Sequence, residues 1–215
     1  MNFSTDRDLL LLEPRVFNDV AFIAQEFVHE SDGAVSATTL TSVQADFEMA
    51  DVDAGSVVLI SQVPHEVVER IDANMLTISL PRARTSDVAV PGESGSSQEI
   101  IVRTFRQQAA LVHDALLRMI GIDPDDSGGL DEDAVISLNL MAKLEALGTL
   151  ERVYSAAQLY DSMGETDNTY FREKADEYRS RFATARERAT ILIDVNQDGL
   201  AEERRRLGLI RLRRD

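Results

Sequence analysis

The most regular pattern in the sequence is an apolar repeat near its C-terminal end, where hydrophobic side chains recur alternately at intervals of four and three residues. A repeat that averages 3.5 residues places these side chains along one face of an α-helix and packs them against a second, nearly parallel helix. The pattern predicts a helix that begins near Asp167 or Asn168 and ends near Ile193. The repeat consists of Phe171, Ala175, Tyr178, Phe182, Ala185, Ala189 and Leu192.

Three further helices are predicted. Thr104 and Gln107 form a capping box that opens one of them, and Gly121 is suited to its C-terminal end. Another spans about residues 139–163, with Gly148 as a candidate for a break. The N-terminal one covers residues 13–30, because a proline suits its first turn and apolar side chains recur every three or four residues. Its apolar residues are Val16, Val20, Ile23 and Phe27.

Between Thr38 and Leu80 the composition shifts to β-branched residues interrupted by turn-forming residues. Strands are predicted at residues 57–60, 66–71 and 75–80, and these form a small antiparallel sheet or barrel. The run from Pro91 to Ser97 is predicted to be a linker, and residues 99–103 are a candidate for a further strand.

Together these elements predict an α+β fold, mostly a helical bundle, with a small antiparallel β module inserted after the first helix. The expected divisions are an N-terminal helix over residues 1–34, a small β module and linker over 35–97, and a helical bundle over 98–193. Residues 194–215 are expected to form an extended, basic C-terminal docking arm.

Composition excludes several classes of protein. The chain of 215 residues contains no cysteine, which excludes disulfide frameworks, zinc ribbons and cysteine nucleophiles. Its formal net charge of −16 argues against direct nucleic-acid binding, because lysine and arginine carry phosphate recognition. No apolar run approaches the roughly 20 residues that cross a bilayer, so we expect no membrane partner.

The run from Asp194 to Gly199 matches the opening of an EF-hand or dockerin-type calcium loop, D-x-N-x-D-G. The twelfth loop position, where a bidentate carboxylate belongs, is Arg205, although Glu202 or Glu203 could substitute in an irregular site. The alternative, which we favour, is an Asx-rich turn that stops the preceding helix. We therefore expect no bound metal and no cofactor.

Candidate catalytic residues are few. His29, His65 and His113 are far apart and none has a metal-ligand spacing. The acidic segment of residues 123–133 contains Ser127-Gly128-Gly129, which favours a solvated connection over a catalytic scaffold. There is also no nucleophile elbow or phosphate-binding loop. We expect no catalytic residues and no enzymatic activity.

The C-terminal segment is the strongest candidate for partner binding. The net charge is −16 and residues 204–215 contribute +5, so the other residues carry −21. The segment also contains large apolar side chains, which a purely solubilising tail does not need. It is predicted to bury them on a partner while its arginines meet carboxylates, or else to fold back on its own domain. The predicted partner-binding residues are Arg204, Arg205, Arg206, Leu207, Leu209, Ile210, Arg211, Leu212, Arg213 and Arg214.

Two stretches resemble proteins of tailed-bacteriophage virions. Residues 45–60, ADFEMADVDAGSVVLI, followed by MLTIS at 75–79, resemble a hairpin module of phage structural proteins. The helical half and its arginine-rich end resemble phage proteins of neck-protein size. The family indicated is that of head-to-tail connector or adaptor proteins. Such adaptors are small helical proteins that form a ring below the portal, and many extend a C-terminal segment onto the portal or a neighbouring subunit.

The resemblance implies a structural subunit of the virion, assembled in the host cytoplasm, that forms a ring homo-oligomer linking the portal to the tail. Its partners would be copies of itself, the portal protein and further neck or tail proteins. The alternatives are a metal-dependent hydrolase that uses the acidic residues, and a bacterial interaction protein without a virion role.

Overall fold

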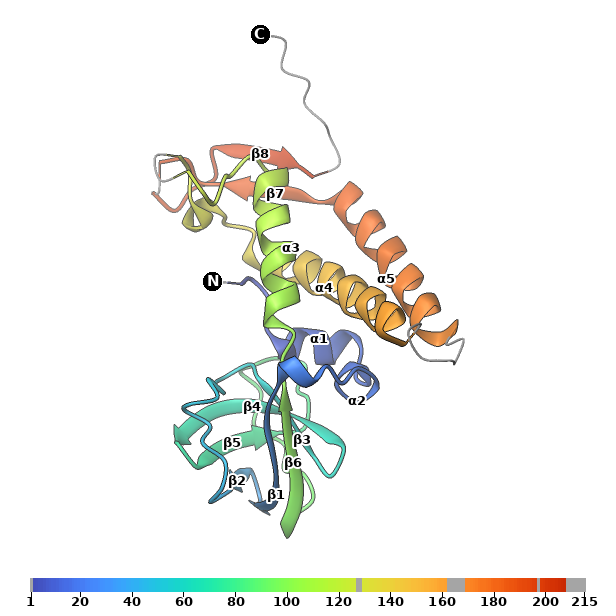
Figure 1. The fold of residues 1–215 in the computed structure, drawn as a ribbon. Helices are drawn as coiled ribbons and strands as arrows, with labels where there is room; N and C mark the ends of the chain where they lie inside the picture. Colours follow the sequence, from blue (N-terminus) through green and yellow to red (C-terminus); the bar gives the residue numbers. More distant parts are fainter. Residues whose placement is uncertain (1, 127–128, 162–168, 197, 208–215) are drawn as a thin grey trace. The chain divides into compact units, whose positions relative to one another are not determined.

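The computed structural model describes residues 2–126, 129–161, 169–196 and 198–207 (Figure 1). The chain divides into two compact units. We call Thr5–Arg106 the barrel unit, and we call residues 1–4 together with 107–215 the helical unit. In the chain, the barrel unit is therefore an insertion near the N-terminus of the helical unit.

The barrel unit contains a closed antiparallel barrel in which neighbouring strands follow the order β1-β2-β5-β4-β3-β6. Its core is aliphatic, and the only aromatic side chain in this core cluster is that of Phe47. Alternate residues of the strands point inward, as the two-residue period of a strand requires. The strands are β1 Glu26–Ser36, β2 Thr39–Thr41, β3 Val57–Ile60, β4 Val63–Asp72, β5 Met75–Ser79 and β6 Gly95–Arg103.

The expectation of a mostly helical bundle with a small β module is wrong, because this six-stranded barrel dominates one of the two units. The strands predicted at residues 57–60, 66–71 and 75–80 correspond to β3, β4 and β5. The boundary between the units lies at residues 106 and 107, and not in the predicted linker, whose last three residues belong to β6.

The helix predicted over residues 13–30 is also wrong. The chain instead forms α1 (Asp6–Leu12), α2 (Val16–Asp19), a 3-10 turn and then β1. Val16 and Val20 are buried as the repeat predicts, but β1 closes the barrel against β6 and β2. Pairing on both edges fixes the backbone as a strand, and this tertiary effect outweighs the local apolar spacing.

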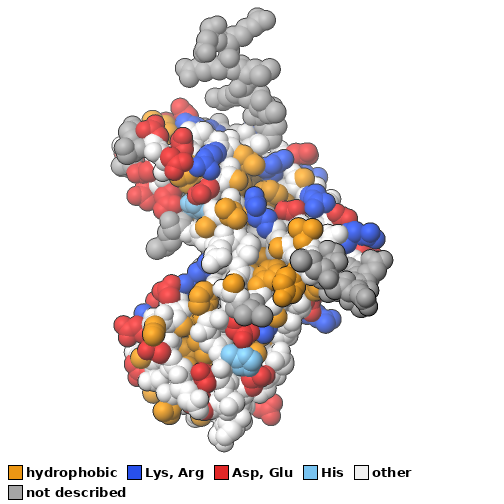
Figure 2. Space-filling view, viewed as in Figure 1, with side chains coloured by type: hydrophobic (Ala, Val, Ile, Leu, Met, Phe, Trp, Pro, Cys, Tyr) orange, Lys and Arg blue, Asp and Glu red, His pale blue; other side chains and the backbone are white. Residues whose placement is uncertain are grey.

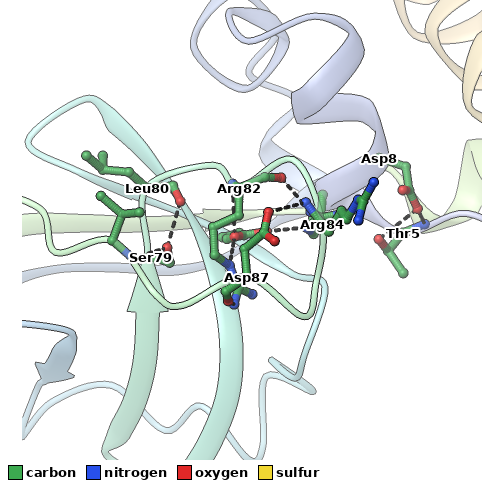
Figure 3. Close-up of polar contacts among 10 residues, drawn as sticks. Thr5, Asp8, Ser79, Leu80, Arg82, Arg84 and Asp87 are labelled. Atoms are coloured by element: carbon green, nitrogen blue, oxygen red, sulfur yellow. Dashed lines mark hydrogen bonds and ion pairs between the residues drawn. The ribbon is translucent and has the colours of Figure 1, made fainter.

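A buried ion-pair network joins α1 to the barrel. Glu66 of β4 is completely buried, and its carboxylate accepts hydrogen bonds from the guanidinium groups of Arg7 and Arg82. Arg7 also donates to the carbonyl oxygen of Arg82 at 2.6 Å, and Arg82 donates to the carbonyl oxygen of Asp87 at 2.6 Å. Arg82 belongs to the loop that follows β5. Figure 3 shows the polar contacts of this loop, in which Leu80, Arg82, Arg84 and Asp87 are labelled.

The helical unit contains α3 (Arg106–Met119), α4 (Leu138–Asp161) and α5 (Thr169–Arg188), followed by the two-stranded hairpin of β7 (Thr190–Ile193) and β8 (Glu203–Arg206). The helix predicted after Thr104 forms, and the amide of Arg106 donates to the Thr104 hydroxyl at 3.2 Å. The predicted capping box with Gln107 is wrong, because the amide of Thr104 donates to the carbonyl oxygen of Gln25. Gly148 does not interrupt α4. A Cβ atom there would lie 2.8 Å from Val112 of α3, so glycine permits the close approach of the two helices.

The predicted helix–helix contact of the apolar repeat is confirmed, because α5 packs along α4 (Figure 1). Tyr178 of α5 is buried and stacks on Tyr154 of α4, with ring centroids 5.9 Å apart and planes 7° apart. The predicted end of the helix near Ile193 is wrong. The helix ends at Arg188, and the β-branched residues that follow form β7, which pairs with β8.

Candidate functional site

The hairpin of β7 and β8 has one face turned toward the core of the helical unit. Ile191 and Ile193 are buried there, and so is Leu207, which directly follows β8. Arg205 lies opposite Ile191 and therefore shares this inner face. Its guanidinium donates to the carbonyl oxygen of Ile120 at 2.5 Å and pairs with the Glu203 carboxylate at 2.8 Å.

The other face of the hairpin, which we call the outer face, carries Thr190, Leu192, Arg204 and Arg206. Arg204 lies opposite Leu192, and Arg206 lies opposite Thr190. Both arginines are exposed, and neither forms an ion pair within the described residues of the chain. In a chain of net charge −16, the outer face is therefore a local positive surface around a partly exposed leucine.

The predicted partner-binding residues divide into three groups. Arg204 and Arg206 belong to the outer face, whereas Arg205 and Leu207 are turned into their own unit. The predicted residues from Leu209 to Arg214 lie outside the described residues. Residues 203–207 fold back on their own domain, because β8 pairs with β7. This is the second of the two alternatives that the sequence left open. Partner binding by the arginines stays a prediction.

The loop between β7 and β8 brings three acidic residues together. One carboxylate oxygen from each of Asp194, Asp198 and Glu202 lies within 4.8 Å of the others. The amides of Asp198 and Gly199 donate to the two oxygens of Asp194 at 3.2 and 2.7 Å. Gly199 has a φ angle of +87°, which its lack of a side chain permits. Glu202, and not Arg205 at the twelfth position, joins the cluster.

Two acidic residues of the segment 123–133 have partners outside this cluster. Asp125 pairs with Arg118 at 2.9 Å, and Asp131 accepts a hydrogen bond from the amide of Asp133 at 3.2 Å at the start of a short 3-10 helix. Figure 2 shows acidic side chains gathered at the end of the helical unit where this segment and the β7–β8 loop lie. Among the described residues, the β7–β8 loop holds the one group of acidic or histidine side chains close enough to share a metal ion.

The three histidines have separate surroundings. In the barrel unit, exposed His29 lies between Glu26 and Glu99, at 2.9 and 3.2 Å. Hydrogen bonds to the Glu99 and Glu26 carboxylates raise the pKa of His29. His65 is buried in the same unit and donates from Nδ1 to the carbonyl oxygen of Val63 at 2.9 Å; burial lowers its pKa. The prediction of independent histidines agrees with these separate sets of partners.

His113 belongs to a buried polar network in the helical unit that sequence reasoning missed. Its ring nitrogens lie 3.0 Å from a carboxylate oxygen of Glu145 and 2.9 Å from one of Glu132. Glu145 is completely buried and also accepts hydrogen bonds from the amides of Phe3 and Ser4, at 3.1 and 2.8 Å. The network therefore fixes residues 3 and 4 to α3 and α4. No local pattern indicates it, because its members are far apart in sequence.

The hydrogen bond to Glu145 raises the pKa of His113 above its ordinary value. A histidine whose pKa is raised on folding contributes stability that is fully present below about pH 6.5 and is lost as the pH rises through the raised pKa. We expect His113→Asn to destabilise the protein more at pH 5.5 than at pH 9. Urea denaturation at both pH values measures this, and an equal loss at both would contradict a charged His113.

No helix among the described residues is long and apolar enough to cross a membrane. Comparison of the chain with protein-family models, characterised proteins and solved structures gave no match.

Proposed function

We propose that the chain is a non-enzymatic structural subunit that forms a ring, and that it serves as an adaptor or connector between the portal and the tail of a tailed bacteriophage. The observation that carries the proposal is the outer face of the hairpin, where exposed Arg204 and Arg206 flank Leu192 on an otherwise acidic chain.

The outer face has the chemistry of a docking surface for an acidic partner. Guanidinium groups bind carboxylates through two parallel hydrogen bonds, and such contacts are stronger than those between neutral groups. The chain itself supplies a suitable partner surface, because the residues before Arg204 carry a net charge of −21. Contact between the outer face of one copy and acidic side chains of the next is heterologous, and repetition of it around a rotation axis closes a ring.

The position in the virion neck rests on the family resemblance. The resembling segments of residues 45–60 and 75–79 lie in the barrel unit and contribute β3 and β5. Head-closure and tail-terminator proteins are β-rich, whereas simple adaptors are helical. A chain that combines a closed barrel with a helical unit fits a neck protein that shares features of both groups.

The docking role can be tested with charge-reversing variants. We expect the intact protein to self-associate at about 50 mM salt and to dissociate as screening increases. The double variant Arg204→Glu/Arg206→Glu is expected to be monomeric at the same concentration. Light scattering after size-exclusion chromatography gives the masses.

The matched control is Arg152→Glu/Arg172→Glu, which makes the same charge change at two exposed arginines of α4 and α5. This control should associate as the intact protein does. Equal masses for the hairpin variant and the intact protein would contradict docking through the outer face. A truncation for the same purpose must end after Leu207, because β8 and Leu207 are part of the fold.

A further inference from the structure

We infer that residues 88–94 of the barrel unit, which we call the strap, are released from the barrel in acid, and that His65 of β4 is the residue that responds to pH. The strap lies between β5 and β6 in the chain and has no regular secondary structure. The inference does not depend on the proposed virion role. It rests on the position of the strap against a buried imidazole nitrogen.

The side chain of His65 points into the barrel. His65 lies opposite Val58 of β3 and two residues before Val67, and both valines belong to the core cluster of the barrel. Residues in these positions share one face of a sheet. His65 is 3% exposed, and its Nδ1 donates to the carbonyl oxygen of Val63 at 2.9 Å. In the neutral ring, Nε2 is therefore the nitrogen without a proton.

The strap closes over this nitrogen. Nε2 of His65 is fully buried and forms no hydrogen bond with any residue that the structure describes. A Cβ atom at Gly92 would overlap Nε2, so the backbone of the strap lies directly against the ring. This contact leaves no space for a water molecule between Gly92 and the ring. The closed strap therefore accepts the neutral ring only.

Hydrogen bonds to the end of β5 hold the strap in place. The amide of Val90 donates to the Ser79 hydroxyl at 2.8 Å, and the amide of Leu80 donates to the carbonyl oxygen of Val90 at 2.9 Å. The Ser79 hydroxyl in turn donates to the carbonyl oxygen of Leu80 at 2.7 Å (Figure 3). These bonds join neutral groups, so they do not themselves titrate between pH 5 and 8.

The charged groups around His65 are directed elsewhere. β3 and β5 contain no titratable side chain. The charged side chains of the other surrounding elements are exposed or have partners of their own: Glu66 pairs with Arg7 and Arg82 on the other face of β4, Glu99 of β6 contacts His29, Arg103 of β6 pairs with Glu26, and Glu93 of the strap is exposed.

Burial lowers the pKa of His65, and the hydrogen bond to the Val63 carbonyl opposes this effect less strongly. A lowered pKa means that His65 favours the closed strap fully above about pH 6.5, and that this contribution is lost as the pH falls below 6.5 and through the lowered pKa. Protonation places a proton on Nε2 where Gly92 offers no acceptor and excludes water. Release of the strap admits water to the charged ring.

Hydrogen exchange of the Leu80 and Val90 amides tests the inference. Each exchange rate is compared with the intrinsic rate at the same pH, which gives the protection of the two bonds that hold the strap. From pH 7.5 to pH 5 we expect this protection to fall about tenfold or more in the intact protein. In His65→Leu, which has no titratable group at this position, it should change by less than about twofold. His29→Gln, which removes the exposed histidine of the same unit, is the control and should behave as the intact protein does.

Gly92→Ala gives a second test that leaves His65 in place and remains informative if His65→Leu fails to fold. Its Cβ atom would overlap the ring, so the strap amides should already be poorly protected at pH 7.5. The amide of Val67, which donates to the carbonyl oxygen of Ser56 at 2.9 Å, is the reference for the barrel itself and should keep its protection. Protection of the strap that does not change with pH, that falls equally in His65→Leu, that is unaltered in Gly92→Ala, or that falls together with that of Val67 would overturn the inference.

Discussion

Glu66→Ala is expected to lower the free energy of unfolding of the barrel unit by about 3–5 kcal/mol. The carboxylate of Glu66 is completely buried between Arg7 and Arg82, whose side chains are only 9% and 6% exposed. Removing it leaves two buried guanidinium groups without a counter-charge, and this desolvation cost is what makes the effect large. Urea denaturation followed by far-UV circular dichroism measures the loss.

The control is Glu69→Ala, which removes an exposed acid from the same strand and should change stability by less than about 0.5 kcal/mol. Replacing Arg7, Glu66 and Arg82 together by apolar residues of similar size should restore much of the loss, because no charge is then left unpaired. A Glu66→Ala variant as stable as the intact protein would show that the ion-pair network does not hold α1 to the barrel.

Tyr178→Ala is expected to destabilise the helical unit by about 3–5 kcal/mol, the usual cost of truncating a buried aromatic side chain. Tyr178 is 1% exposed and stacks on Tyr154, and the guanidinium carbon of Arg181 lies 4.9 Å from the centre of its ring. The variant therefore loses a stacked ring and a cation–π contact, and it leaves a cavity between α4 and α5.

Tyrosine fluorescence is a selective probe for this unit, because all four tyrosines of the chain follow residue 107. Phe182→Ala should have a smaller effect, since Phe182 is only partly buried. Glu173→Ala, at an exposed position of α5, is the control. A loss below about 1 kcal/mol for Tyr178→Ala would contradict a closed contact between the two helices.

The elements that sequence predicted well are those whose local pattern agrees with their tertiary surroundings. β3, β4 and β5 are runs of β-branched residues between turns, and α3 has both a cap and an apolar face. β1 was missed because its register against β6 shifts at several points, which breaks the alternation expected of a strand. Barrel closure is a long-range property, and no single segment of sequence indicates it.

The candidate site, too, depends on long-range structure that no single segment of sequence indicates. The arginine-rich end was identified from composition. In β8, however, successive side chains point to opposite faces, so Arg204 and Arg206 lie on one face of the hairpin and Arg205 lies on the other. The calcium-like pattern was recognised, whereas the participation of Glu202 depends on how the loop closes. The partners of Glu66 and Glu145 lie 16 to 142 residues away in the chain, so those networks had no local signal.

The most direct test of the proposed role is quantitative mass spectrometry of purified particles produced by the genome that encodes the chain. A ring-forming neck subunit should be present in a constant number of copies for each portal. Arg204→Glu/Arg206→Glu should remove it from the particles, whereas Arg152→Glu/Arg172→Glu should not. Particles that are complete and infectious without the chain, or a copy number that does not change when the outer face is reversed in charge, would contradict the account.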